Sequence, residues 1–216
     1  MNCHDLQGII ESCSAVAAIS FSRGINLRKP LAGAALAALA ITACDDTDPF
    51  GAQLPTVADS YTIFALSGTP PAYPSALNTA ARAATRVDGN ANFDVAFDID
   101  SDGNAVLYPV KLVVSSIGGN RPVGLRKVDA PFDSVTSAPT GTYQQDSAVV
   151  AGRGQVVVVE ANRGSSGDIC AFNISQNIYS KIVIDSVDVP ARTINIRTVM
   201  DPNCGFRHLG EGIPGK

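Results

Sequence analysis

Apolar and polar residues alternate along much of the chain after residue 59, in runs that turn-forming residues keep short. The segment 60–67 is rich in β-branched and aromatic residues, and Gly68-Thr-Pro-Pro71 stops it. A run of this kind, ended by glycine and proline, predicts a β-strand. Similar runs predict strands at 155–160, 179–187 and 193–199. The last two are separated by Pro190-Ala-Arg192, and we expect them to form a hairpin.

The segment 93–114 carries the strongest local signal. Large apolar residues hold every second position from 93 to 99, and aspartates hold most of the positions of the opposite face. The apolar face has Phe93, Val95, Phe97 and Ile99, and the other face has Asp94, Asp98 and Asp100. Polar turn residues at 101–104 then lead into a second strand-like run at 105–114. Two such runs around a polar turn predict a β-hairpin.

The segment 76–87 is ambiguous. Its alanines favour a helix, whereas the alternation of Ala83, Thr85 and Val87 with the residues between them favours a strand. We expect a strand here, with a short helix as the alternative.

Many short strands and frequent chain breakers define the fold class. The chain has 19 glycines and 13 prolines, and no stretch of it has the pattern of a long amphipathic helix. These features predict an all-β fold, as a single antiparallel β-sandwich or a small barrel. We expect one β-rich domain over residues 59–216, which is long enough to build a hydrophobic core.

The N-terminal region has the pattern of a signal peptide. Basic residues at 23, 28 and 29 precede the stretch Leu31–Ala43, in which nearly every residue is apolar or small. This stretch is shorter than the roughly 20 residues that a helix needs to cross a bilayer. Basic residues before an apolar segment and small residues at its end match a secretory signal. A buried helix is the alternative, but the acidic residues that follow Cys44 do not suit one.

The residues Ile41-Thr42-Ala43-Cys44 resemble the lipobox of bacterial lipoproteins. The resemblance implies that the thiol of Cys44 is diacylated, that residues 1–43 are removed, and that the new N-terminus is acylated. Three acyl chains hold a protein on a membrane stably, whereas one chain holds it only marginally. The implied location is the bacterial cell envelope, with a lipid anchor on the periplasmic or cell-surface face.

Two segments flank this signal. Residues 1–22 stand where a signal peptide normally has only a short basic segment, and a misassigned translation start explains them. After Cys44, the chain is polar up to residue 58 and contains Pro49, Gly51 and Pro55. We expect residues 44–58 to be the lipidated cysteine and a tether that holds the domain off the bilayer.

The charge balance excludes one class of partner. Lysine and arginine number 16 against 20 aspartates and glutamates, so the net charge is −4. A mildly acidic chain without a basic stripe is not expected to bind nucleic acid.

Cysteine usage after Cys44 points to one disulfide. Cys170 and Cys204 are the only cysteines left, and an even pair in an exported protein predicts a bridge between them. In the chain-entropy view, closing a loop of about 35 residues contributes roughly 3–4 kcal/mol. With His208, the two cysteines would offer a metal too few ligands for a structural zinc site.

One acidic loop has the pattern of a cation site. Asp98, Asp100 and Asp102 match the first ligand positions of a calcium-binding loop, and a glycine follows at the position of the sharp turn. Pro109 stands where such a loop carries a bidentate glutamate. A calcium site built from these three aspartates and Asn104 is one interpretation. A plain hairpin turn with solvated carboxylates is the other.

Two functions follow from these patterns. The favoured one is a non-enzymatic, membrane-anchored module that binds or stabilises an envelope partner, for example as an extrinsic subunit of a membrane complex. The alternative is an envelope protein that binds calcium or a small ligand at Asp98–Asp102. An enzyme is not expected, because His208 is the sole histidine after Cys44 and no Gly-x-Ser-x-Gly turn presents a serine. No cofactor other than calcium is implied.

Overall fold

The computed structural model describes residues 51–87, 92–114, 121–165, 167–173 and 175–213. The strands, in chain order, are β1 (Val57–Phe64), β2 (Ala76–Asn78), β3 (Ala83–Thr85), β4 (Val95–Ile99), β5 (Ala105–Pro109), β6 (Val123–Val128), β7 (Val149–Ala151), β8 (Val156–Asn162), β9 (Asn177–Asp188) and β10 (Thr193–Asp201). The short helices α3 (Val110–Val113) and η3 (Phe132–Ser134) lie between strands. The described part of the chain is therefore almost entirely β, which confirms the predicted fold class.

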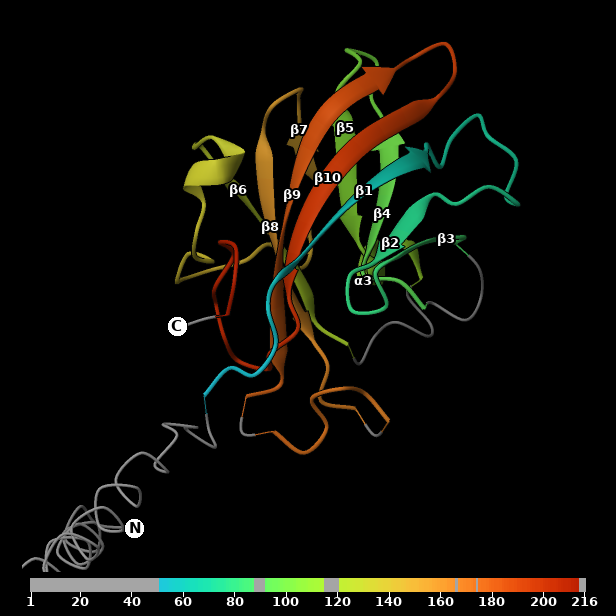
Figure 1. The fold of residues 1–216 in the computed structure, drawn as a ribbon. Coiled ribbons are helices and arrows are strands. Elements are labelled where there is room, and N and C mark those ends of the chain that lie inside the picture. Colours follow the sequence, from blue (N-terminus) through green and yellow to red (C-terminus); the bar gives the residue numbers. More distant parts are fainter. Residues whose placement is uncertain (1–50, 88–91, 115–120, 166, 174, 214–216) are drawn as a thin grey trace, which may run out of the picture. The chain divides into compact units, whose positions relative to one another are not determined.

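The strands form two antiparallel sheets of five strands each, which face one another (Figure 1). Sheet A has the order β1-β10-β9-β8-β6, and sheet B has the order β3-β2-β4-β5-β7. Each sheet keeps two edge strands within the described residues. The architecture is therefore the β-sandwich, and not the barrel that the sequence left open.

Along the central strands of sheet A, successive side chains pack on opposite faces of the sheet. In β8, Val157 and Val159 enter the core between the sheets, whereas Val156 and Val158 point to the opposite face of sheet A. The largest fully buried side chains are Phe93, Phe97, Ile63, Leu77, Leu107, Leu125, Ile178, Ile182, Ile184, Ile194, Ile196 and Leu209. Both faces of sheet A are thus apolar along β8, which is why this strand is a continuous valine run.

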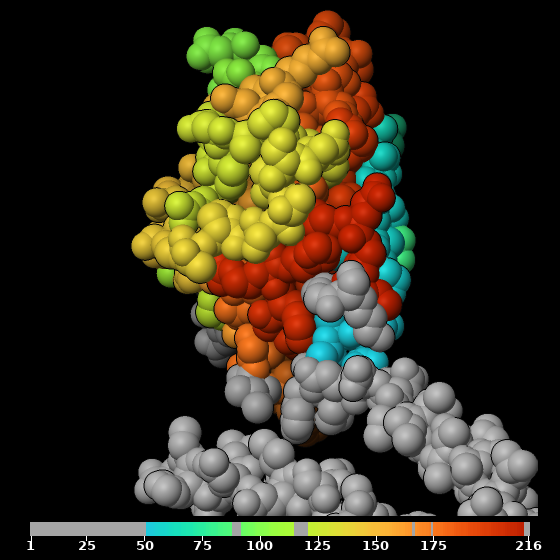
Figure 2. Space-filling view, turned by 60° about the vertical axis from the view of Figure 1, so that its left-hand side comes forward, coloured from blue at the N-terminus to red at the C-terminus, as the bar shows by residue number. Residues whose placement is uncertain are grey.

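The outer face of sheet A is covered by two chain segments. Figure 2 shows the segment around residues 129–145, in yellow, and the C-terminal segment, in red, over this face, with β1 in cyan beside them. Their apolar side chains form a second cluster with the sheet, made of Val135, Ala138, Tyr143, Val156, Val158, Tyr179, Val183 and Leu209. Arg207 fastens the C-terminal segment, because its Nε donates to Ala138 O at 3.0 Å and its Nη1 donates to the Tyr179 hydroxyl at 2.9 Å.

Both predicted hairpins are present, with different boundaries. The hairpin at 179–187 and 193–199 is β9–β10, and the hairpin at 93–100 and 105–114 is β4–β5. The second strand of the latter ends at Pro109, and residues 110–113 form α3 instead of continuing it. Proline has no N–H to donate to a ladder, so the strand stops there.

The ambiguous segment 76–87 is neither one strand nor a helix. It is a tight hairpin of β2 and β3, in which Ala76 pairs with Thr85 and Asn78 pairs with Ala83. The turn between them places Arg82 at φ 53°, in the left-handed region. The strands β6 and β7 were not predicted, because β7 has only three residues and the β6 sequence, Val-Gly-Leu-Arg-Lys-Val, does not alternate regularly.

The end of the predicted tether contacts the domain. Ala52 is buried, and the N–H groups of Gln53 and Leu54 donate to Asn203 Oδ1, each at 3.0 Å. β1 begins at Val57. Residues 52–54, which the sequence assigns to the tether, therefore lie against the domain, where Asn203 binds two of their N–H groups.

A buried ion pair joins the two sheets. Arg163 follows β8 in sheet A, and Asp94 precedes β4 in sheet B. Nη2 of Arg163 donates to Oδ2 of Asp94, and the side chains are 4% and 0% exposed. Thr79 donates to the same oxygen from its N and Oγ1, each at 2.7 Å, and Nη2 of Arg121 lies 3.3 Å from Oδ1. The carboxylate is thus surrounded by donors from three other parts of the chain.

A second ion pair joins the sheets at the opposite end of β4. Nη2 of Arg192, in the β9–β10 turn, donates to Asp98 Oδ1 at 2.7 Å, and its Nε donates to Ser67 O at 3.0 Å. Ser67 in turn donates to Asp98 from its N and Oγ. β4 is therefore tied to sheet A near both of its ends.

We expect Asp94→Asn to lower the free energy of unfolding by about 3–5 kcal/mol, because it removes the nearest countercharge of the buried Arg163 guanidinium and leaves only Asp168, at 4.0 Å. Asp185→Asn is the matched control. Its partner is Arg197, and the two side chains are 34% and 49% exposed, so the expected loss is below about 1 kcal/mol. Urea unfolding measures both variants. Equal losses would show that Asp94 does not hold the sheets together.

Candidate functional site

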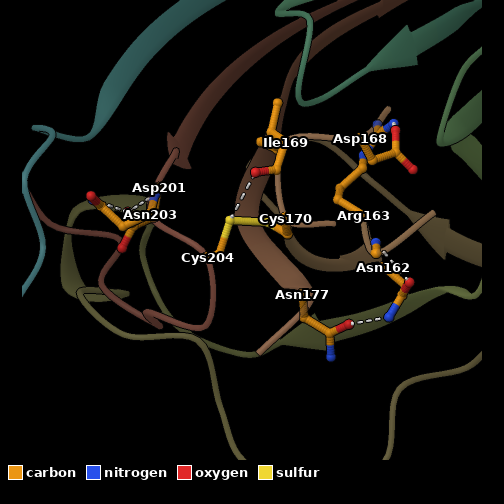
Figure 3. Close-up of a disulfide and its surroundings, with 10 residues drawn as sticks. Asn162, Arg163, Asp168, Ile169, Cys170, Asn177, Asp201, Asn203 and Cys204 are labelled. Atoms are coloured by element: carbon orange, nitrogen blue, oxygen red, sulfur yellow. Dashed lines mark hydrogen bonds and ion pairs between the residues drawn. A yellow bond between two sulfur atoms is a disulfide. The ribbon is translucent and has the colours of Figure 1, made fainter. Parts of the chain in front are cut away.

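The predicted disulfide joins Cys170 and Cys204. The Cα atoms are 5.7 Å apart, and the bridge links the loop after β8 to the segment after β10 (Figure 3). Cys204 is therefore not available as a thiol, which leaves His208 without a cysteine partner. The predicted lipidation site, Cys44, lies outside the described residues.

The predicted calcium residues serve the β4–β5 hairpin instead. Asp98 is engaged by Arg192 and Ser67. Asp100 Oδ1 accepts the N–H of Asp102 at 2.9 Å and the N–H of Asn104 at 2.8 Å. These bonds lower the pKa of Asp100 and leave its carboxylate occupied by the turn itself. The arrangement favours the hairpin-turn interpretation over the calcium site.

No group of three or more Cys, His, Asp and Glu side chains in the described part of the chain is placed to hold a metal ion. None of the helices described is long and apolar enough to cross a membrane.

A groove of about 730 Å³ lies on the outer face of sheet A. We call it the outer groove. Outward-facing residues of β1, β9 and β10 form its floor, and η3 and the C-terminal segment form its walls. Its lining includes Ser60, Phe132, Lys181, Arg197 and Glu211. Within the described residues, the C-terminal segment is bonded to this edge at Thr56, just before β1, and the groove opens beside Ala58 and Ser60.

Lys181 is the most unusual residue of the outer groove. It lies in the middle of β9 and is only 3% exposed. Its Nζ donates to the carbonyls of Phe132 at 2.7 Å and Val135 at 3.0 Å, and it lies 4.3 Å from the Phe132 ring centroid. Burial lowers the pKa of the Lys181 ammonium from its usual 10.5, although the nearby Asp133 acts in the opposite direction.

Arg197 places a second cation beside the same aromatic ring. Its guanidinium carbon lies 5.1 Å from the Phe132 ring centroid. Asp185 holds it in place through bonds of 3.0–3.1 Å, at a bulge that interrupts the β9–β10 ladder next to Ile196. Phe132 thus lies close to two cations, one buried and one partly exposed.

The buried ammonium of Lys181 is the group of the outer groove best placed to bind an acceptor. An ammonium has three N–H donors, and within the described residues Lys181 uses two of them. The third is available to an acceptor, such as a carboxylate or an amide oxygen. The lining residues include no histidine or cysteine, so the groove lacks the common partners of a nucleophile.

The open edge of β1 runs beside the outer groove. In the β1–β10 ladder, Ala65 N bonds to Arg192 O on the β10 side, whereas Phe64 N bonds to Pro74 O on the other side. Because successive residues of a strand point to opposite sides, the N–H and C=O groups of Ala58, Ser60 and Thr62 point away from β10. All three residues are exposed. No backbone bond within the described chain satisfies these groups.

The other edge strands are shorter or covered. β3 and β7, at the edges of sheet B, have 3 residues each. β6, at the far edge of sheet A, is bridged in the middle by Gln144, which exchanges two backbone bonds with Leu125. β1 has 8 residues, and it carries none of the lysine or proline residues that protect many exposed edges. It is the longest edge strand that the structure describes.

No pattern along the chain predicts this site. Lys181 was part of a predicted strand, but a lysine at a regular position in such a strand normally faces solvent. Its burial depends on Phe132 and Val135, which come from a covering segment with no clear pattern. The alternation of 60–67 did predict the strand that became β1, but it could not predict that this strand lies at an edge.

Comparison of the chain with models of known protein families, with curated proteins and with solved structures finds no match.

Titration of Lys181 predicts a specific pH dependence. Its pKa is lowered by folding, so as pH rises the folded state loses this proton before the unfolded state does. Stability then rises with pH wherever the unfolded state binds more protons. We expect the free energy of unfolding of the wild type, minus that of Lys181→Met, to increase as pH rises toward 10.5.

Denaturant unfolding at several pH values measures this difference. Lys127→Met, which removes an exposed ammonium from β6, is the control for removing a lysine charge as such. A difference that stays flat or falls with pH for Lys181→Met would contradict the buried ammonium.

Proposed function

We propose that the protein is a lipid-anchored, non-enzymatic component of the bacterial cell envelope, whose β-sandwich binds a partner protein by strand addition along β1. In this role it serves as an extrinsic subunit of a membrane complex. The open edge of β1 carries the proposal. The lipobox-like sequence that ends at Cys44 supports the anchor.

Strand addition uses the backbone groups that β1 leaves unpaired. An extended segment of the partner aligned along Val57–Phe64 would exchange backbone hydrogen bonds with Ala58, Ser60 and Thr62. Each such bond contributes about 0.5–1.5 kcal/mol net. The C-terminal segment sets one limit of this edge, because Thr56 N already donates to Gly212 O at 3.0 Å.

The outer groove supplies specificity for the added strand. Ala58 and Ser60 line the groove, so alternate side chains of the added strand would fall over it. Lys181 and Arg197 favour an acceptor or an acidic side chain there, and Phe132 favours an apolar or aromatic one. The partner segment is therefore expected to carry at least one acidic or amide side chain next to an apolar one.

A proline substitution tests the edge without breaking the sheet. Ser60→Pro removes an N–H that points away from β10, and proline is tolerated on edge strands in this orientation. We expect it to reduce partner recovery about tenfold, since losing one bond and adding a clash cost about 1.4 kcal/mol or more. The measurement is quantitative pull-down of the full-length protein from detergent-solubilised native membranes.

Two companion variants make this result interpretable. Ser60→Ala keeps the N–H and is expected to recover the partner as the wild type does. Tyr61→Pro removes an N–H that faces β10, so it is expected to lower the melting temperature, whereas Ser60→Pro is not. A wild-type pull-down that returns only the bait, or full recovery with Ser60→Pro, would overturn strand addition.

The anchor has its own test. Intact-mass spectrometry of the protein from its native membrane is expected to show a chain that begins at Cys44 and carries three acyl chains. Cys44→Ser is expected to be neither acylated nor membrane-bound. An unmodified Cys44 in the wild type would rule out the anchor, while leaving the β1 edge to be judged by the pull-down.

A further inference from the structure

Three large apolar side chains are exposed at one end of the sandwich. Phe172 is 101% exposed, Ile169 is 54% exposed and Leu54 is 52% exposed. A fully exposed phenylalanine beside other exposed apolar residues is typical of a contact surface. We call these three residues the apolar tip.

Hydrogen bonds and the disulfide place the backbone of the apolar tip around Cys170 and Cys204. Leu54 N donates to Asn203 Oδ1 at 3.0 Å, and Asn203 precedes Cys204. The sulfur of Cys204 is bonded to that of Cys170 and lies 3.7 Å from Ile169 O (Figure 3). The residues come from the N-terminal segment and from the loop between β8 and β9. The disulfide and Asn203 therefore bring together two distant parts of the chain.

Residues 167–173, which carry Ile169 and Phe172 of the tip, form hydrogen-bonded turns. The N–H groups of Asp168, Ala171 and Asn173 each donate to the carbonyl three residues earlier, at 2.9–3.2 Å. The side chain of Cys170 is fully buried. Phe172 therefore lies in a series of turns that the disulfide ties to the domain, and the backbone of these turns keeps its side chain exposed.

The same loop has no net charge. Between residues 163 and 176 the only charged residues are Arg163 and Asp168, which pair at 4.0 Å. Arg163 is also buried against Asp94. An apolar, uncharged tip suits a partner surface that is itself apolar and carries no charge to pair with. The boundary between the headgroups and the acyl chains of a lipid bilayer is such a surface.

We infer that the apolar tip contacts the lipid bilayer and fixes the orientation of the domain on the membrane. This rests on the proposed anchor at Cys44. Cys44 and Gly51 are seven positions apart in the chain, a separation that spans at most about 25 Å when fully extended. Leu54, which belongs to the tip, follows Gly51 by three positions. A lipidated Cys44 would therefore keep the end of the domain that carries the tip close to the membrane. With the tip on the bilayer, β1 runs away from the membrane surface.

The absence of tryptophan from the sequence allows a direct test. Phe172→Trp adds a single tryptophan at the tip, on a side chain that contacts little else. Val189→Trp is the matched control, because Val189 is 46% exposed and lies in the β9–β10 turn. β9 spans Asn177–Asp188, so about 40 Å of strand separates that turn from the disulfide end (Figure 1).

Both full-length variants are purified in their lipidated form and incorporated into phosphatidylcholine vesicles with brominated acyl chains. We expect Phe172→Trp to lose most of its emission and to shift to shorter wavelength, whereas Val189→Trp keeps its emission. Equal emission from the two variants in vesicles that carry the protein would overturn contact of the tip with lipid. Failure of both variants to float with the vesicles would instead overturn the anchor, and with it the orientation.

Discussion

The buried carboxylate of Asp94 is the constraint on which the rest of the sandwich depends. It lies between the guanidinium of Arg163, which belongs to sheet A, and donors from its own sheet. A charge in this position is stable only when its partners stay in place, so the two sheets cannot slide or separate at this end. The pair of Asp98 with Arg192 repeats the arrangement at the other end of β4. Two ion pairs thus set the relative position of the layers that an apolar core alone would leave adjustable.

Because the two sheets are fixed relative to one another, the outer face of sheet A can carry the covering segments and the outer groove. Segments on either side of the groove cover most of that face, and each is bonded to it through a buried or half-buried cation: Lys181 for η3 and Arg207 for the C-terminal segment. The cover stops short of β1, which leaves an open edge beside a groove with two cations and one aromatic ring. At the end of the sandwich that carries the disulfide, exposed apolar side chains project from the loop that the disulfide holds. The proposed partner binding and the proposed membrane contact therefore use different parts of the same domain.

Local patterns predicted the elements whose structure is local. Alternation identified the β4–β5 and β9–β10 hairpins, and the cysteine count predicted the bridge between Cys170 and Cys204. What escaped prediction depends on contacts between distant residues. Asp94 has the sequence pattern of a solvent-facing residue, and its partner is 69 positions away. The residues around Gln53 have the polar pattern of a tether. The contact that holds them against the domain comes from Asn203, 150 positions away, and no local pattern indicates it. Burial of Lys181 likewise requires a covering segment that no periodicity marks.

Amide hydrogen exchange along β1 tests strand addition most directly. In the purified protein, the N–H groups of Tyr61 and Ile63 face β10 and should be protected, whereas those of Ser60 and Thr62 point outward and should exchange fast. If a partner adds a strand to β1 in native membranes, the N–H groups of Ser60 and Thr62 should become protected there as well. Fast exchange of these two amides in the membrane-bound assembly would contradict strand addition along β1.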